Sequence, residues 1–234
     1  SCYYKVEQRS KERAREAEKV IELAKVERQT HPRMGCKKIH SFLKPKLIEE
    51  GIKLGRDNFI DLMGDNNMHV EKKKKFSKTT YSKHSYAISP NRIKELEIVR
   101  PNQVFVADIT YLRTVNGFAY LFLVTDLYSR KILGYDVRCD MNHKGAILAL
   151  EMALEGVANT NGIIHHTDRG AQYCCRDFLK AFKDTGLVFS NTDDSHVYQN
   201  AVAERLNGII KDEYNLDATF NNWKNAKRAV KEVI

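Results

Sequence analysis

The sequence predicts an α/β protein in which a mixed five-stranded sheet flanked by helices follows a small all-α domain. Three observations support this prediction: an uneven charge distribution, helical patterns at the front of the chain, and a strand-rich second part in which helices alternate with the later strands. An apolar fraction of 42% over 234 residues is sufficient for a buried core.

Positive charge is concentrated in the first hundred residues. Residues 1–100 hold 24 Lys and Arg against 14 Asp and Glu, a net of +10, whereas residues 101–234 hold 15 against 16, a net of −1. This asymmetry indicates a polyanion-binding region in front of a near-neutral globular domain. A solvated basic surface without a partner explains the charge equally well.

Membrane and secretory segments are not predicted. No apolar run approaches the roughly 18 residues that a membrane span needs, and the sequence does not open with a signal peptide. The five cysteines contain no Cys-x-x-Cys pair, which argues against a disulfide framework and a structural zinc site. We therefore expect a protein of the reducing cytoplasm without membrane contact.

Three helices are predicted in the front part. Apolar spacing predicts a helix over residues 10–29, ended by Thr-His-Pro at 30–32. A second helix begins near Gly35, is bent or ended in its first part by Pro45 and closes at Gly51, and a third covers about 56–66. We assign residues 1–29 to an N-terminal helix and 30–68 to a helix-turn-helix-like DNA-binding domain, with a plain helical bundle as the alternative.

Basic residues of this region are the predicted DNA contacts. In a helix-turn-helix unit the third helix enters the major groove, so Arg56 and Asn58 at its start would face the bases. Residues 69–100 are assigned to a basic linker that follows a phosphate backbone, or to a solvated tail. The predicted contacts here are Lys37, Lys38, Arg56, Asn58, Lys72, Lys73, Lys74 and Lys75.

Residues 101–234 are expected to form the α/β domain. Apolar and β-branched runs predict strands at 104–112, 118–127 and 131–137, with a type I′ hairpin at Asn116-Gly117. A helix at 144–158, a strand at 162–165, a helix at 176–184, a strand at 187–190 and a helix from about 199 follow. The order β-β-β-α-β-α-β-α describes the ribonuclease H-like fold.

Three acids fall where this topology brings segments together. Asp108 interrupts the first strand, where an acid is disfavoured, Asp168 ends the fourth strand, and Glu204 lies one turn into the last helix. The first and fourth strands are neighbours in this fold, so the carboxylates should converge and repel unless a cation neutralises them. Oxygen ligands suit Mg²⁺ or Mn²⁺. Two such ions about 4 Å apart would activate a nucleophile and stabilise a leaving oxygen in phosphodiester chemistry.

Residues beside the acids are further candidates. Tyr173 is interpreted as a buried aromatic residue rather than a base-stacking group. His165 and His166 are adjacent in a strand and point to opposite faces, which argues against joint zinc ligation. For two of the predicted phosphate contacts, Asn207 and Lys211, a polar helix surface is an equally good interpretation. The predicted phosphate contacts are Arg169, Asn200, Asn207 and Lys211.

The segments around the acids resemble the catalytic-frame proteins of bacterial insertion sequences that have an integrase-like core. The 35 residues between Asp168 and Glu204 are similar to the D,D-35-E signature of retroviral integrases and related transposases. Phe105 and Gln199 depart from the family pattern, which often has Trp and Asp there. The resemblance covers roughly residues 30–234 and is carried by Arg100-Pro101-Asn102-Gln103, Ala107-Asp108-Ile109-Thr110-Tyr111, His166-Thr167-Asp168-Arg169-Gly170, Gln172-Tyr173, Asn200-Ala201-x-x-Glu204-Arg205-x-Asn207 and Lys211-x-Glu213.

The resemblance implies a DNA transposase, a polynucleotidyl transferase with a DDE triad formed by Asp108, Asp168 and Glu204. It implies binding of double-stranded DNA at terminal inverted repeats and target sites, and strand cleavage and transfer with two Mg²⁺ or Mn²⁺ ions and no small-molecule cofactor. It further implies a homo-oligomer, at least a dimer, in the bacterial cytoplasm at the nucleoid, and additional residues beyond Ile234. Two alternatives stay open: another metal-dependent nuclease of the same fold, and a catalytically silent DNA-binding relative.

Overall fold

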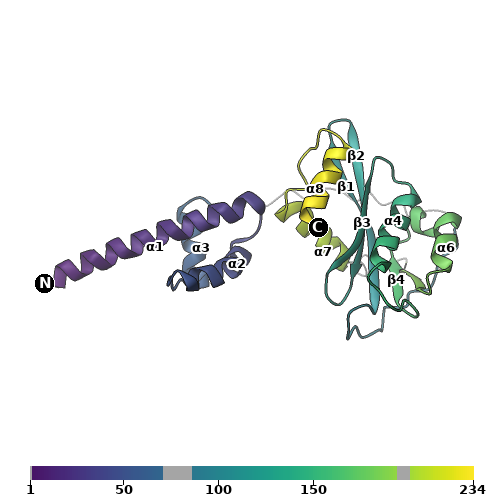
Figure 1. Ribbon diagram of the computed structural model, residues 1–234, viewed down its shortest axis with the longest axis horizontal. Helices are drawn as coiled ribbons and strands as arrows, with labels where there is room; N and C mark the ends of the chain where they lie inside the picture. Colours follow the sequence, from purple (N-terminus) through teal and green to yellow (C-terminus); the bar gives the residue numbers. More distant parts are fainter. Residues whose placement is uncertain (1, 71–85, 194–200) are drawn as a thin grey trace. The chain divides into compact units, whose positions relative to one another are not determined.

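The computed structural model describes residues 2–70, 86–193 and 201–234, with the side chains of residues 2–6 and 201–204 left out. The chain divides into two compact units: Ser1–Phe76 with Asp212–Asn215, and Ser77–Lys211 with Leu216–Ile234. Each unit is described by itself (Figure 1). Within the described ranges, no helix has the length and apolar character needed to cross a membrane.

Three helices build the first unit: α1 (Cys2–Thr30), α2 (Cys36–Glu49) and α3 (Arg56–Asp65). They coincide with the predicted helices, except that α1 begins earlier, at Cys2, because its first turns are rich in Lys, Arg and Glu, which favour helix. Helix α2 continues through Pro45, since the missing N–H removes only one helical hydrogen bond. Gly51 then turns the chain at φ +72°.

Helix packing and one arginine hold this unit together. The guanidinium of Arg28 donates to the backbone carbonyls of Pro32 (3.1 Å), Met34 (2.5 Å) and Met68 (3.0 Å). These bonds fix the chain at both ends of the α2–α3 pair. The core side chains from the three helices are Val20, Ile21, Ala24, Ile39, Leu43, Leu47, Phe59 and Met63.

The second unit is a mixed sheet with strand order β3-β2-β1-β4-β5. Antiparallel pairing joins β1 to β2 and β2 to β3, whereas β4 is parallel to both β1 and β5. This is the ribonuclease H-like topology that the sequence predicts. The strands are β1 (Val104–Thr114), β2 (Gly117–Asp126), β3 (Ile132–Arg138), β4 (Ile164–Thr167) and β5 (Val188–Asn191).

Helices cover both faces of this sheet, α4 and α6 on one side and α8 with α7 on the other (Figure 1). Successive strand residues point to opposite faces, so each strand contributes to two cores. On β2, Phe122 packs in the core with α4 and α6, whereas Leu121 and Leu123 pack in the core with α7 and α8. The helices are α4 (His143–Leu154), α5 (Ala171–Cys174), α6 (Arg176–Lys183), α7 (Ala201–Glu213) and α8 (Trp223–Val233).

The β1–β2 hairpin forms as predicted, but its turn type differs. Thr114 pairs with Gly117, so Val115 and Asn116 are the loop residues. Gly117 has φ +126°, whereas Asn116 does not adopt a positive φ. A type I′ turn requires positive φ at both central residues, so that part of the prediction is wrong. The glycine serves instead as the first residue of β2.

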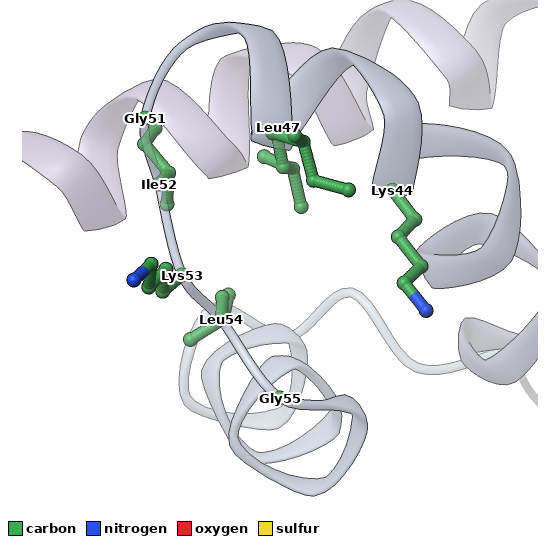
Figure 2. A pocket seen from close by; sticks show the side chains of 8 residues that line it. Lys44, Leu47, Gly51, Ile52, Lys53, Leu54 and Gly55 are labelled. Atoms are coloured by element: carbon green, nitrogen blue, oxygen red, sulfur yellow. The ribbon is translucent and has the colours of Figure 1, made fainter.

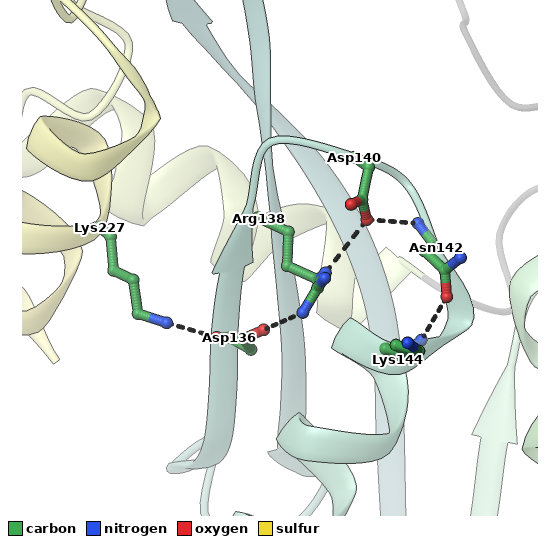
Figure 3. Close-up of polar contacts among 6 residues, drawn as sticks. All are labelled: Asp136, Arg138, Asp140, Asn142, Lys144 and Lys227. Carbon is green, nitrogen blue, oxygen red and sulfur yellow. Dashed lines mark hydrogen bonds and ion pairs between the residues drawn. The ribbon is translucent and has the colours of Figure 1, made fainter.

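The edge strand β3 is tied to α8 by charge (Figure 3). Lys227 of α8 lies 2.8 Å from the Asp136 carboxylate, whose side chain is only 7% exposed. Arg138 lies 3.8 Å from the same carboxylate, and it also lies 3.1 Å from the carboxylate of Asp140. A buried carboxylate needs such partners to be tolerated, so these cations contribute to docking the last helix.

Helix α4 packs directly on the backbone of β3. A Cβ placed on Gly134 would lie 2.0 Å from the Ala149 carbonyl oxygen and 2.6 Å from the Ala153 nitrogen. Neither of those backbone atoms moves without shifting the helix. Glycine at position 134 therefore sets the separation between α4 and the sheet.

We expect Gly134→Ala to lower the free energy of unfolding by about 3 kcal/mol, because the added methyl group forces the helix away from the sheet. Urea denaturation of the full chain measures this. Gly156→Ala is the matched control, since a Cβ there meets no atom within 4 Å. Its stability should stay within about 0.5 kcal/mol of the wild type. Equal losses in both variants would contradict the close-packing argument.

His165 lies in the aromatic core instead of on a polar surface. It is 1% exposed, its ring lies among those of Tyr173, Phe178 and Phe182, and neither ring nitrogen has a hydrogen-bond partner. Burial, with a smaller contribution from neighbouring His166, lowers the pKa of His165 to about 3. Burial likewise lowers the pKa of His166 to about 4. Both histidines are therefore neutral in the folded protein.

We expect His165→Phe to reduce the acid sensitivity of the fold. The pKa of His165 falls from 6.5 to about 3 on folding. Above pH 6.5 the ring is neutral in both the folded and the unfolded chain, so the free energy of unfolding is unaffected by it. Below pH 6.5 the unfolded chain gains a proton first, and the free energy of unfolding decreases as the pH falls towards 3. Removing the imidazole should make the decline shallower by up to about 1.4 kcal/mol per pH unit. Urea denaturation between pH 7 and pH 4.5 measures the slope. Parallel profiles for the variant and the wild type would refute the assignment.

Candidate carboxylate site where β1 and β4 meet

Asp108 and Asp168 occupy equivalent positions on neighbouring parallel strands. The β1–β4 pairing runs up to Ala107 opposite Thr167, and the next residue of each strand is an acid. Residues in register on adjacent strands lie side by side and point to the same face. The predicted adjacency of the first and fourth strands is therefore confirmed, and Asp108 and Asp168 each follow the last paired residue of these strands.

Neighbouring groups orient both carboxylates. The Gly170 backbone N–H donates to Asp168 Oδ1 at 2.9 Å, and the Asn207 amide donates to Asp108 Oδ2 at 2.5 Å. A Cβ at Gly170 would lie 2.9 Å from that Asp168 oxygen, so a larger residue there would displace the carboxylate from this position. Because Asn207 belongs to α7, its contact places this helix against Asp108.

Tyr173 gives independent support for a shared site. Its side chain is 2% exposed, which confirms its interpretation as a buried aromatic residue, and its hydroxyl has no hydrogen-bond partner. Burial raises the pKa of Tyr173 well above its ordinary value, and the charges of Asp108 and Asp168 raise it further. The hydroxyl is therefore within electrostatic reach of both acids.

Glu204 lies in α7, but its side chain is outside the described residues. It precedes Asn207 by three residues, and residues three apart share one face of a helix. The assignment of Glu204 as the third acid stays a prediction.

The chemistry of the site suits a hard divalent cation. Two adjacent carboxylates repel each other, and a cation that accepts oxygen ligands relieves the repulsion. In the part of the chain that the structure describes, no group of three His, Cys, Asp or Glu residues is placed to hold a metal. The described donor set is thus Asp108 and Asp168. His165 does not belong to it, because aromatic rings surround its nitrogens.

The predicted DNA contacts of the helical unit are exposed. Lys37 and Lys38 lie in the first turn of α2, and Arg56 and Asn58 lie in the first turn of α3. The Arg56 guanidinium also donates to Asp57 at 2.8 Å. Three of these side chains are cationic, and their exposure leaves them accessible to a polyanion. Lys72, Lys73, Lys74, Lys75 and Asn200 lie outside the described residues.

The predicted phosphate contacts near the acids have different surroundings. Arg169 is half-buried, and its Nε donates to the Thr192 carbonyl at 2.8 Å. Lys211 is half-buried as well. Asn207 is only 7% exposed and donates to Asp108, so a surface phosphate contact does not fit this residue. Its amide orients a carboxylate instead.

A separate cavity lies in the helical unit. It has a volume of about 360 Å³ and lies between α2 and residues 51–55 (Figure 2). Leucine and isoleucine side chains line it, together with Lys44 and Lys53. It contains no carboxylate, so it is distinct from the site at Asp108 and Asp168.

Sequence reasoning missed the polar residues that support Asp168. Asn191, at the end of β5, is fully buried and donates to the Asp168 carbonyl at 3.2 Å. The preceding residue, Ser190, is also fully buried. A Ser-Asn pair that closes an apolar strand was the available signal, but it is equally typical of a turn.

Comparison with known proteins identifies the family. The integrase core domain model matches residues 99–196. The uncharacterized 31 kDa protein of insertion element IS600 from Shigella sonnei is 35% identical over 82% of this chain and 71% of its own length. The transposase for insertion sequence element IS629, also from Shigella sonnei, is 30% identical over 87% and 66%. Transposase InsF for insertion sequence IS3A from Escherichia coli is 35% identical over 62% and 51%.

Solved structures with a similar chain path are viral integrases. The simian T-cell lymphotropic virus intasome in complex with the PP2A regulatory subunit B56 gamma is 19% identical, covering 76% of this chain and 59% of that chain, at a TM-score of 0.44. The HTLV-2 integrase catalytic core in complex with magnesium, in its trimeric form, is 20% identical over 57% and 82%, also at 0.44.

The fold and the sequence relatives define the class of this protein: it has an integrase-type core of polynucleotidyl transferases. More narrowly, the chain belongs to the family of bacterial insertion-sequence transposases. The match spans 71%, 66% and 51% of the length of the three relatives described above.

We expect Asn207→Ala to lower the free energy of unfolding by about 1–2 kcal/mol, because Asp108 loses a charge-assisted hydrogen bond in a half-buried position. Urea denaturation in the presence of EDTA measures this loss. Arg205→Ala, at an exposed position of the same helix, is the control and should be nearly neutral. Equal stabilities of the two variants would show that the contact with Asp108 contributes nothing.

Proposed function

We propose that this chain cleaves and joins DNA strands at the ends of an insertion sequence, with Asp108, Asp168 and Glu204 as its catalytic acids. The supporting observation is the β1–β4 register, in which an acid follows the last paired residue of each strand. Membership in the transposase family supports the same reaction class.

The side chains present the oxygen ligands that this reaction needs. Two Mg²⁺ or Mn²⁺ ions bound here would supply Lewis-acid stabilisation of the attacking and leaving oxygens. Asp108, Asp168 and Glu204 are the residues that would hold these ions. Asn207 and the Gly170 N–H keep the two aspartates in the ligating orientation.

Strand cleavage and strand transfer are two successive displacements at phosphorus. Water attacks a phosphodiester at the element end, forming one P–O bond and breaking another, which frees a 3′-hydroxyl. That hydroxyl then attacks a phosphodiester of the target DNA and releases a second 3′-hydroxyl. No covalent protein intermediate is formed, so the protein contributes alignment and charge stabilisation.

We propose double-stranded DNA as the substrate and a homo-oligomer, at least a dimer, as the working form in the bacterial cytoplasm at the nucleoid. Residues 30–68 bind the terminal repeats, residues 69–100 follow the DNA backbone, and residues 101–234 carry the chemistry. The exposure of the basic residues on α2 and α3 supports this division. The proposed DNA contacts are Lys37, Lys38, Arg56, Asn58, Lys72, Lys73, Lys74, Lys75, Arg169, Asn200 and Lys211.

We expect Asp108→Asn and Asp168→Asn each to reduce cleavage of labelled element-end duplexes in Mg²⁺ by at least about a thousandfold, equivalent to ~4 kcal/mol of transition-state stabilisation. DNA binding, measured by fluorescence anisotropy, should persist because neither acid contacts the phosphates directly. Asp140→Asn, at an exposed carboxylate just after β3, is the control and should cleave normally.

Three other results would change the functional assignment. Retained cleavage by the Asp108 variant would refute the catalytic assignment. Cleavage by the wild type without joining of a 3′ end into target DNA would favour another nuclease of this fold. DNA binding without cleavage or joining would favour a silent relative.

A further inference from the structure

Four fully buried polar side chains line the paired ends of β4 and β5. His166 lies opposite Ser190, and Thr167 lies opposite Asn191. Polar groups buried in strands destabilise a fold unless they are hydrogen-bonded. Their concentration beside Asp168 therefore points to specific contacts that the site needs.

Asn191 joins three segments through one amide. Its Nδ2 donates to Thr167 Oγ1 at 3.0 Å and to the Asp168 carbonyl at 3.2 Å. Its Oδ1 accepts from the Ser89 backbone N–H at 2.9 Å. One side chain thus connects the end of β5, the residue proposed as a metal ligand, and a segment about a hundred residues earlier in the chain.

These bonds act on Asp168 through its backbone. Asn191 Nδ2 donates to the carbonyl of Asp168 together with Thr167 Oγ1, which lies 2.8 Å from it, while the Gly170 N–H donates to one of the Asp168 carboxylate oxygens. The orientation of a peptide group sets the direction in which the neighbouring Cα–Cβ bond points. Loss of the Asn191 contact would therefore allow the Asp168 carboxylate to turn while every atom of the carboxylate is retained.

Residues 89–92, here called the docked connector, are held by the backbone N–H groups of Ser89 and Arg92, and the Asn91 side chain donates to Asp193 Oδ2 at 3.5 Å. Besides the Ser89 contact, the Arg92 N–H donates to Ser190 Oγ at 3.0 Å. Ser190 Oγ also bonds His166 Nδ1 at 2.9 Å. The docked connector belongs to the compact unit that contains the sheet, although it falls within the segment predicted as a linker. Of the two strand residues that hold the connector, Asn191 also donates to the Asp168 carbonyl.

We propose that Asn191 is a positioning residue that couples docking of the connector to divalent-cation binding at Asp168. This inference rests on the proposed function, because it requires Asp168 to be a metal ligand. Partners that orient a ligand typically change metal affinity by about 10–100-fold. Coupling between two binding events is reciprocal, so a bound cation also favours the docked connector.

The test uses Mn²⁺ as the probe and the full chain as the protein. Free Mn²⁺ is counted by electron paramagnetic resonance, and the stability without metal is measured by urea denaturation. Asn191→Ala and Ser190→Ala are matched variants, since both residues are fully buried and each loses one bond to the connector backbone. Ser89→Pro removes the Ser89 N–H donor while Asn191 itself is retained.

We expect Asn191→Ala to weaken Mn²⁺ binding by about tenfold or more. Ser89→Pro should weaken it by about fivefold, and Ser190→Ala should leave it unchanged. Bound Mn²⁺ should also slow trypsin cleavage after Arg92 in the wild type but not in Asn191→Ala. If Asn191→Ala does not fold, the Ser89→Pro result and the trypsin result on the wild type decide the question.

Three results would overturn the inference and leave the proposed function intact. The first two are a Mn²⁺ affinity equal to that of the wild type in Asn191→Ala or in Ser89→Pro. The third is a loss of Mn²⁺ affinity in Ser190→Ala as large as the loss in Asn191→Ala. A wild-type chain that binds no Mn²⁺, with Asp168→Asn indistinguishable from it, would overturn both.

Discussion

The parallel pairing of β1 with β4 is the constraint on which the candidate site depends. Four residue pairs, ending at Ala107 and Thr167, determine that Asp108 and Asp168 come next at the same level of the sheet. A slip of one residue in this register would turn one of the two carboxylates to the opposite face. The two acids therefore follow one another across the sheet because β1 and β4 are paired by backbone hydrogen bonds, and no attraction involving their side chains is required.

The surrounding structure keeps that register while accommodating two repelling charges. On the α4 side, direct helix-to-strand contact at Gly134 and the aromatic core around Phe178 make the sheet rigid. On the other side, α7 supplies the amide that meets Asp108. The unpartnered Tyr173 hydroxyl shows that polar satisfaction is incomplete beside the acids.

Much of the fold could be predicted from local pattern. Apolar runs gave the five strands, and the positions of Pro32 and Gly51 agreed with helix ends because their backbone preferences are intrinsic. The turn type failed because Asn-Gly carries a statistical preference that pairing of Thr114 with Gly117 overrides. The two aspartates could be predicted because an acid inside or just after an apolar strand is conspicuous.

The supporting residues could not be predicted, because their roles arise from packing between distant segments. Asn207 meets Asp108 across 99 positions of sequence, and Ser89 meets Asn191 across 102. An asparagine on a helix has the same local signature whether it faces solvent or a carboxylate. The contact between Asn207 and Asp108 was not predictable for this reason.

Arg28 gives the helical unit a mechanical property. Its guanidinium donates to the Met68 carbonyl, which lies after α3 on the side of the chain that leads to the sheet-containing unit. A force that pulls on the backbone after Met68 acts on the hydrogen bonds of Arg28 before it acts on the packing of α3. A lysine at position 28 would not replace it, because a single ammonium lacks the planar fork that engages several carbonyls at once.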